Sequence, residues 1–226
     1  MKILYLETSS KNCSVAISDG EKMLCVCEEV SENYKQSESL HTFVEWALEG
    51  AELTMKDIEA VSLGKGPGSY TGLRIGAASA KGFCYGLKIP LVAVNSMESM
   101  IQPLLGQNYD LIISLVDARR MEVYTAVYDG NSGKELIPTE AKVLDETSFQ
   151  EFKDKKVLFV GDGAAKAKDI LDLPNAEFKT DIYPSAQYLV KKTLEKIQNK
   201  DFEDIAYFEP FYLKEFHGIK KKKSED

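Results

Sequence analysis

Histidine and arginine are scarce in this chain of 226 residues. The two histidines, His41 and His217, lie far apart in the sequence, which excludes the HExxH and Cys2His2 zinc motifs. The arginines are Arg74, Arg119 and Arg120, and the formal net charge is −8. Because a free-standing nucleic-acid-binding protein usually carries a basic surplus, the composition disfavours that class.

Long apolar runs and metal-binding cysteine pairs are also lacking. The chain turns polar after Leu6, too early for a signal peptide, and no stretch approaches the roughly 18 apolar residues of a membrane span. The four cysteines include no CxxC pair, and Cys25 and Cys27 would share one face of a strand, which favours inert structural thiols over a zinc site. We therefore expect a soluble, cytoplasmic protein without a metal site.

A pattern of elements occurs twice along the chain. The apolar patterns predict strands at residues 3–7, 14–18, 23–28, 60–63, 111–116, 122–128 and 157–160. In each half, a strand and a hairpin are followed by a short strand that runs into a glycine turn, about a hundred residues from its counterpart. This repeat indicates a structural duplication, in which two related α/β lobes enclose a cleft.

Two helices are predicted in the first half. The apolar positions with helical spacing in the first helix are Leu40, Phe43, Val44, Ala47 and Leu48. Trp46 lies off this stripe, as either an interface residue or a partly buried rim residue. The second helix, at about residues 71–87, is rich in small side chains. They allow close approach of another helix, within the molecule or from a partner.

The segment 66–76, GPGSYTGLRIG, carries the densest chemical signal. Its glycines allow positive φ, Ser69 and Thr71 can cap the following helix, and a helix N-terminus after a glycine loop can bind an anion. The spacing fits neither a Walker A loop, nor GxGxxG, nor GxSxG. The residues leave open both a structural turn and a phosphate cradle formed by Gly66, Gly68 and Ser69.

Two further polar segments have two interpretations each. Glu7 and the hydroxyls that follow it either meet a phosphate or Mg²⁺ in a cleft or belong to a capped turn. Asp117, Arg119, Arg120 and Glu122 form either an ion-pair cluster at a lobe or partner contact or a solvated turn. Cys84 has no histidine close to it in the sequence to act as a base, so a thiol nucleophile is disfavoured.

The chain resembles the TsaB family, also called YeaZ, over residues 3 to about 214. The matching segments are ILYLETS at residues 3–9, GPGSYTGLRIG at 66–76, DARRMEVY at 117–124, GDGA at 161–164 and PFYL at 210–213. The first two segments are shared with the catalytic relative TsaD, and the third separates the two families.

The resemblance implies an actin-like (ASKHA, ribonuclease H-like) duplicated α/β fold, whose two lobes each contain a mixed β-sheet flanked by helices. Residues 1–100 would form the first lobe and residues 101–226 the second. The segment at about 205–218 would pack back toward the first lobe, and residues 219–226 would form a frayed basic tail at Lys220–Lys223.

The resemblance also implies a non-catalytic role in tRNA modification. A TsaD-type subunit transfers threonylcarbamoyl to adenosine 37 of ANN-decoding tRNAs, and the TsaB-type subunit holds it through first-lobe helices. The implied partner-binding residues are Leu40, Phe43, Trp46, Ala47, Thr71, Arg74, Ala77 and Ala80. A TsaE-type ATPase is the third member, the chain alone can form a homodimer, and tRNA is met indirectly through the complex. The chain would have no cofactor of its own, while ATP or ADP at the junction with the catalytic subunit stays open.

Two departures from the family pattern bear on function. The HxxxH metal ligands of the catalytic relative match Gln36 and Leu40 here, neither of which replaces an imidazole, so no metal and no catalytic residue are expected. The usual aspartate of the opening motif is Glu7, which disfavours nucleotide chemistry by the chain alone.

Two enzyme functions remain as alternatives. The first is an autonomous ATP-binding enzyme with an actin-like fold, and the second, less favoured, is a glycopeptidase-type hydrolase. If the small-residue helix face points outward, Ala80→Arg should break partner binding without unfolding the lobe, whereas unfolding would show that this face is core.

Overall fold

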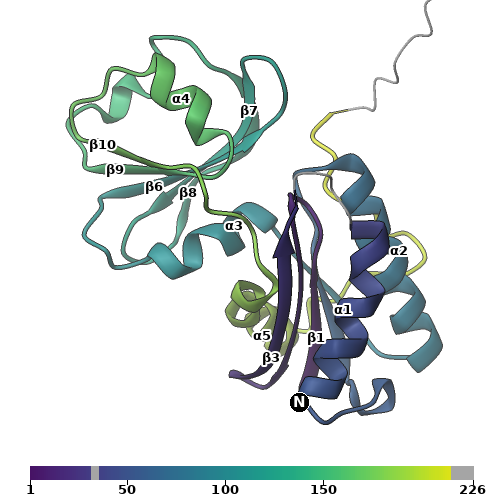
Figure 1. Ribbon diagram of the computed structural model, residues 1–226. Coiled ribbons are helices and arrows are strands. Elements are labelled where there is room, and N and C mark those ends of the chain that lie inside the picture. Colours follow the sequence, from purple (N-terminus) through teal and green to yellow (C-terminus); the bar gives the residue numbers. More distant parts are fainter. Residues whose placement is uncertain (32–35, 215–226) are drawn as a thin grey trace, which may run out of the picture.

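The computed structural model describes residues 1–31 and 36–214, and the side chains of residues 36–38 lie outside that description. The predicted tail at 219–226 also lies outside it. Two five-stranded sheets form two lobes, each flanked by helices on both faces (Figure 1). This arrangement confirms the predicted duplicated α/β fold. Within the described residues, no helix combines the length and apolar character that crossing a membrane requires.

The first sheet has the order β3-β2-β1-β4-β5. Its strands are β1 (Lys2–Glu7), β2 (Asn12–Asp19), β3 (Lys22–Val30), β4 (Ala60–Gly64) and β5 (Leu91–Val94). The first three form an antiparallel meander, with the predicted turn at Asp19-Gly20, and β4 and β5 add in parallel to β1. The first four strands confirm the predictions to within two residues at each end, and β5 was not predicted.

The second sheet repeats this topology. Its strands are β6 (Leu111–Asp117), β7 (Glu122–Asp129), β8 (Glu135–Val143), β9 (Val157–Val160) and β10 (Ala176–Lys179), in the order β10-β9-β6-β7-β8. β6, β7 and β8 form the antiparallel meander, and β9 and β10 extend it in parallel. Each strand of the first sheet therefore has a counterpart in the second.

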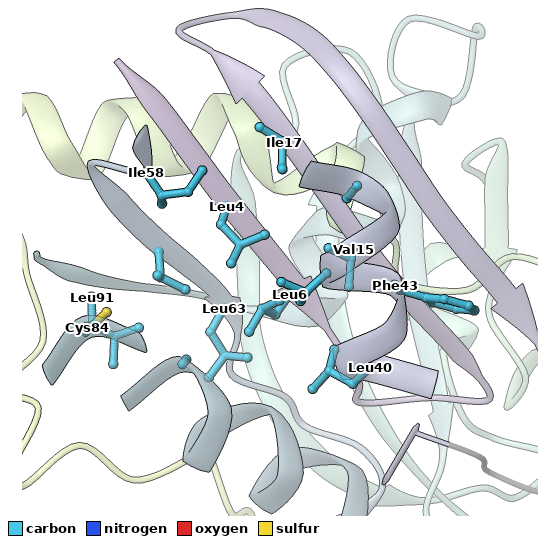
Figure 2. Close-up of a cluster of buried hydrophobic side chains, with 14 of the residues drawn as sticks. Leu4, Leu6, Val15, Ile17, Leu40, Phe43, Ile58, Leu63, Cys84 and Leu91 are labelled. Atoms are coloured by element: carbon cyan, nitrogen blue, oxygen red, sulfur yellow. The ribbon is translucent and has the colours of Figure 1, made fainter. Parts of the chain in front are cut away.

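Helices α1 (Gln36–Gly50) and α2 (Tyr70–Leu87) lie side by side on one face of the first sheet (Figure 1). Figure 2 shows Leu40 and Phe43 of α1 among side chains of the sheet such as Leu6 and Val15. The apolar stripe predicted for α1 is therefore the stripe that packs against the sheet. Cys25 and Cys27 of β3 are partly buried against the same cluster, in keeping with structural thiols.

The last helices of the two lobes are exchanged. Helix α3 (Ser96–Ile101) follows the first sheet along the chain but packs on the second, whereas α5 (Val190–Gln198) follows the second sheet and packs on the first. The other elements are the helix α4 (Ala164–Ile170) and the 3-10 turns η1 (Met55–Asp57), η2 (Gln102–Leu104), η3 (Gln150–Phe152) and η4 (Ala186–Leu189). The division of the chain at residue 100 stays a prediction. Helix α5, although it follows that division, lies against the first lobe.

The segment after α5 runs back along the first lobe. The backbone N–H of Glu203 donates to Leu91 over 2.9 Å, and that of Phe211 donates to Lys65 over 2.8 Å. Phe208 is buried in the core cluster beneath α2. These contacts bring the end of the described chain to the side of the glycine loop.

Candidate functional site

A cleft of about 900 Å³ opens between the two lobes. The loop between β1 and β2, the glycine loop before α2, the hairpin between β6 and β7 and the C-terminal segment all contribute to its wall. Two motifs from different halves of the sequence therefore meet there, since Gly68, Ser69, Asp117, Arg119 and Arg120 line the same cavity.

The glycine loop packs tightly on the end of β1. A Cβ atom at Gly68 would lie 2.1 Å from the carbonyl oxygen of Ser9, and one at Gly72 would lie 2.1 Å from that of Thr8. The backbone N–H of Ser69 donates to Ser9 over 2.7 Å, and the hydroxyl of Thr8 donates to the Gly72 carbonyl over 2.8 Å. These glycines are required because another backbone occupies the space of a side chain.

Several N–H groups of this loop already have acceptors inside the chain. That of Gly66 donates to the Ser96 hydroxyl over 3.1 Å, and that of Gly72 donates to the Ser69 side chain, the N-cap of α2, over 3.3 Å. Gly66 has a φ of +96° beside the cis bond to Pro67, a conformation that suits glycine. The geometry supplies a structural reason for the loop, and the phosphate cradle stays a prediction.

Glu7 ends β1 with its side chain fully enclosed. Its Oε1 atom accepts the N–H of Ser9 over 2.8 Å, whereas Oε2 has no hydrogen-bond partner among the described residues. Burial raises the pKa of this carboxyl group, so the enclosure favours its protonated form. A carboxyl group that is fully enclosed, and whose ionised form burial disfavours, does not suit the binding of Mg²⁺.

The β6–β7 hairpin presents the charged motif of the second lobe. The Asp117 carboxylate forms an ion pair with Lys166, whose Nζ atom lies 2.6 Å from Oδ1. Glu122 forms an ion pair with Lys214. Arg119 and Arg120 occupy the turn with φ of +71° and +53°, and both are exposed. Neither guanidinium has a hydrogen-bond or ion-pair partner among the residues that the structure describes, so the motif is partly ion-paired and partly open.

Most of the residues named for partner contact lie in the core. Leu40, Ala47 and Ala80 are fully buried, and Phe43 and Ala77 are nearly so. Their side chains face the first sheet, because the apolar stripe of each helix serves the core before any partner. The prediction that these five contact a partner directly is corrected accordingly, and Ala80→Arg would place a charge in the core.

The outer face of α1 and α2 carries the remaining candidates. Trp46 is 55% exposed, and Thr71 and Arg74 are exposed on α2. The Arg74 guanidinium lies 5.5 Å from the centroid of the Tyr70 ring, and the Tyr70 ring packs at a tilt against that of Tyr212, with the two centroids 5.2 Å apart. Arg74 thus borders both the outer helix face and the cleft.

The nucleophiles considered for a hydrolase are poorly placed. Cys84 is buried, and burial raises the pKa of its thiol to about 12. His41 Nε2 lies 3.2 Å from the hydroxyl of Ser79, but this pair sits on the outer helix face rather than in the cleft. Leu40, which the family resemblance pairs with a metal ligand of the catalytic relative, is enclosed in the core, and Gln36 lies outside the described side chains. Neither Cys84 nor the His41–Ser79 pair therefore provides an enclosed hydrolytic site.

Several cleft residues were not predicted from the sequence. They are Lys11, Asp162, Lys166, Tyr183, Tyr212 and Lys214. Asp162 accepts the backbone N–H of Asp117 over 2.9 Å, and burial raises the pKa of its carboxyl group. The signal for Asp162 and Lys166 was the glycine turn at 161–163, because the duplication places that turn opposite the glycine loop of the first lobe.

Comparison with known proteins shows which family this chain resembles. A family model described as TsaD, tRNA N6-adenosine threonylcarbamoyltransferase, matches residues 26–217. The tRNA threonylcarbamoyladenosine biosynthesis protein TsaB of Bacillus subtilis is 31% identical over 178 residues, or 76% of each chain. TsaB of Haemophilus influenzae is 23% identical over 95% of this chain and 94% of its own.

Solved structures agree on the fold. YeaZ from Pseudomonas aeruginosa superposes with a TM-score of 0.78 at 22% identity, and covers 94% of this chain and 99% of its own. A second Pseudomonas aeruginosa structure, of an uncharacterized protein with similarity to peptidase YeaZ, gives 0.81 at 23% identity with the same coverage.

The duplicated lobes, the cleft between them and the TsaD family match define an actin-like α/β protein of the TsaD type. Within that class, the curated relatives decide the branch. The chain belongs to the TsaB family, also called YeaZ.

Proposed function

We propose that this chain takes part in tRNA threonylcarbamoyladenosine biosynthesis as a non-catalytic partner subunit. It holds and activates a TsaD-type catalytic subunit, which transfers threonylcarbamoyl to adenosine 37 of ANN-decoding tRNAs in the cytoplasm. The names of its TsaB relatives support the pathway. A TsaE-type ATPase completes the set, and ATP or ADP belongs at the junction with the catalytic subunit.

One observation carries the partner role, namely the outer face of α2. Ala78, Gly82 and Gly86 follow one another at four-residue spacing on the exposed side of the helix. A Cβ atom at Gly82 or Gly86 would meet nothing within 4 Å, so nothing within the described chain requires glycine there. Glycine in a helix interior costs about 1 kcal/mol relative to alanine. Close approach of a helix from another chain supplies the missing reason.

Helices α1 and α2 each present an exposed aromatic residue. Tyr85, one residue before Gly86, is 82% exposed, and Trp46 lies on the neighbouring helix. Exposed aromatic side chains on the same two helices as a small-residue stripe suit a helix-to-helix interface, in which such side chains supply most of the binding energy. A second copy of this chain would compete for the same face when the catalytic subunit is absent.

The test combines purified chain with a TsaD-type subunit from the same source. Light scattering should show a heterodimer, and tRNA modification with the remaining components should stop when this chain is omitted. Undiminished modification without it would contradict the proposal. Turnover of ATP by the isolated chain would favour the autonomous enzyme instead.

Gly82→Leu sharpens this test. The leucine fits the isolated chain, because the space around Gly82 is open, but it obstructs a helix packed against the stripe. We expect heterodimer affinity to fall by about tenfold or more while the melting temperature stays level or rises. Lys191→Leu, which adds the same side chain to an exposed position of α5, is the matched control and should assemble normally.

A further inference from the structure

The walls of the inter-lobe cleft differ in charge from the rest of the molecule. The chain as a whole has 28 Lys and Arg against 36 Asp and Glu. In the cleft, five cations face two carboxylates, Asp117 and Asp162. The cations are Lys11, Arg119, Arg120, Lys166 and Lys214. A cationic cleft in an acidic protein is suited to an anionic ligand, because its field is concentrated where the rest of the surface repels anions.

Two of the chain's three arginines stand together at the mouth of this cleft. Arg119 and Arg120 form the turn of the β6–β7 hairpin, and both have positive φ. Such backbone costs a side-chain-bearing residue about 1–2 kcal/mol. Their guanidinium groups have no partner among the described residues, so the contacts within the chain do not explain them. A planar guanidinium is the side chain best shaped to hold a phosphate through two hydrogen bonds.

Aromatic rings line the same cleft as these cations. Tyr70, Tyr124, Tyr183 and Tyr212 line the cleft, and the rings of Tyr212 and Tyr70 pack at a tilt of 40° with their centroids 5.2 Å apart. The hydroxyl of Ser9, a nearly fully buried residue of the cleft wall, has no hydrogen-bond partner among the described residues. A groove that combines cations with aromatic rings is the means by which proteins bind single-stranded nucleic acid, with phosphates on the cations and bases on the rings.

The cleft fits a strand better than a free nucleotide. Clustered backbone N–H groups are a common cradle for a polyphosphate, but three of those in the glycine loop, on Gly66, Ser69 and Gly72, are already bonded within the chain. The cationic side chains of the cleft are instead spread over both lobes, from Lys11 to Arg120. Groups distributed in this way match phosphates that recur along a chain.

We propose that the inter-lobe cleft binds a short single-stranded stretch of RNA, with Arg119 and Arg120 on its phosphates and Tyr212 beneath a base. The assignment of that RNA to tRNA rests on the proposed function. This proposal of direct contact replaces the expectation that the chain meets tRNA only through its partner. The overall acidity of the chain keeps the contact local and dependent on salt.

The experiment measures binding of the isolated full chain to a fluorescent RNA of about eight nucleotides and to fluorescent tRNA, by anisotropy at several salt concentrations. Arg119→Gln with Arg120→Gln removes two phosphate contacts. The plot of log affinity against log salt should become shallower, with the magnitude of its slope smaller by about 1.4. Affinity near 0.15 M salt should fall by about tenfold. Arg119→Lys with Arg120→Lys keeps both charges and should restore most of the slope.

The matched control removes two charges elsewhere. Lys153→Gln with Lys155→Gln alters exposed lysines before β9, outside the cleft, and should leave slope and affinity unchanged. Equal losses in both double variants, or no loss in either, would overturn the proposal. Displacement of the RNA by excess ATP would also overturn it, because the cleft would then be a mononucleotide site. If the double glutamine variant loses its fold, Arg120→Gln alone tests the proposal. The expected change in the salt slope is then half as large, because one phosphate contact is removed instead of two.

Heterodimer formation is measured in parallel on the same preparations. Assembly with a TsaD-type subunit that persists while RNA binding is absent would overturn the cleft proposal and leave the partner role standing. RNA binding without assembly would overturn the partner role and leave the cleft standing.

Discussion

Glu7 fits its place only because residue 64 has no side chain. A Cβ atom on Gly64 would lie 1.9 Å from the Oε2 atom of Glu7, so the longer carboxyl group uses space that glycine leaves free. The same oxygen has no hydrogen-bond donor among the described residues, and burial raises the pKa of the group. The sequence marked Glu7 as a departure from the family pattern, but its protonation preference follows from neighbours that are distant in the sequence.

Glu7→Gln should make the protein more stable at neutral pH. Because the folded-state pKa lies above the ordinary value of 4.5, the native protein binds a proton that the unfolded chain releases, and stability falls as pH rises through that window. Glutamine has nearly the same shape and no charge, so this fall should disappear. Thermal melts between pH 4 and pH 8 check it. Glu151→Gln, at an exposed site, is the control, and parallel pH profiles for wild type and Glu7→Gln would refute the expectation.

Helix α2 uses glycine for opposite reasons on its two faces. Toward the sheet, Gly72 lies against the backbone of Thr8 and Gly76 against the Thr8 hydroxyl. Toward solvent, Gly82 and Gly86 have open space. Composition alone predicted a helix suited to close approach, but not which glycine served the core and which the surface. That distinction depends on where the β1–β2 loop crosses the helix, which is a tertiary contact.

The two faces predict opposite effects for one substitution. Gly72→Ala forces its Cβ atom into the Thr8 carbonyl and should cost about 1–3 kcal/mol of unfolding free energy. Gly82→Ala meets nothing and should gain up to about 1 kcal/mol from helix propensity. Urea unfolding of both variants checks the pair. Equal changes would mean that the two faces of α2 do not differ as the structure has them.

Strands with alternating apolar residues were predicted well, and two of the strands that were missed, β5 and β8, have physical reasons. β8 pairs only with β7, is largely exposed and contains Pro138, so it lacks the apolar pattern of a buried strand. β5 has four residues, too few for periodicity to register. Helix α5 was also missed, although the sequence contained a signal for it. Val190, Leu194 and Ile197 have helical spacing, and they pack on the first sheet.

The candidate site was predictable only in its separate parts. The glycine loop and the motif around Arg119 stood out in the sequence, and the duplication predicted a cleft between lobes. That these two motifs face each other, with Tyr212 from the C-terminal segment, follows from contacts across more than half the chain. Local patterns contain no information on such contacts.

The exchanged helices join the two lobes into one molecule. η4 and α5 cover the face of the first sheet opposite α1 and α2, where Ala186 and Leu189 are fully buried. The hydroxyl groups of Thr193 and Ser62 lie 2.6 Å apart within this interface. At the crossing, Ser185 donates to the Glu28 carboxylate over 2.6 Å. The first sheet therefore depends on a segment that follows the second along the chain.

A fragment of residues 1–100 should not fold by itself. Without α5, the fully buried side chains Ile3, Tyr5 and Val92 would face water. Each such side chain contributes about 1.5–3 kcal/mol when buried, so losing three approaches the 5–15 kcal/mol that stabilises a typical domain. Circular dichroism melts should show no cooperative transition for this fragment.

Joining residues 1–100 to residues 184–214 through a flexible linker should restore a cooperative transition, because it returns both α5 and the buried Phe208 to the first lobe. The same fusion with Leu189→Asp is the control and should melt like the bare fragment, since that change places a charge in the restored interface. A bare fragment that melts cooperatively near the temperature of the full chain would show that the lobe boundary at residue 100 is a folding boundary. The exchange of helices would then organise the cleft without being needed for the stability of the first lobe.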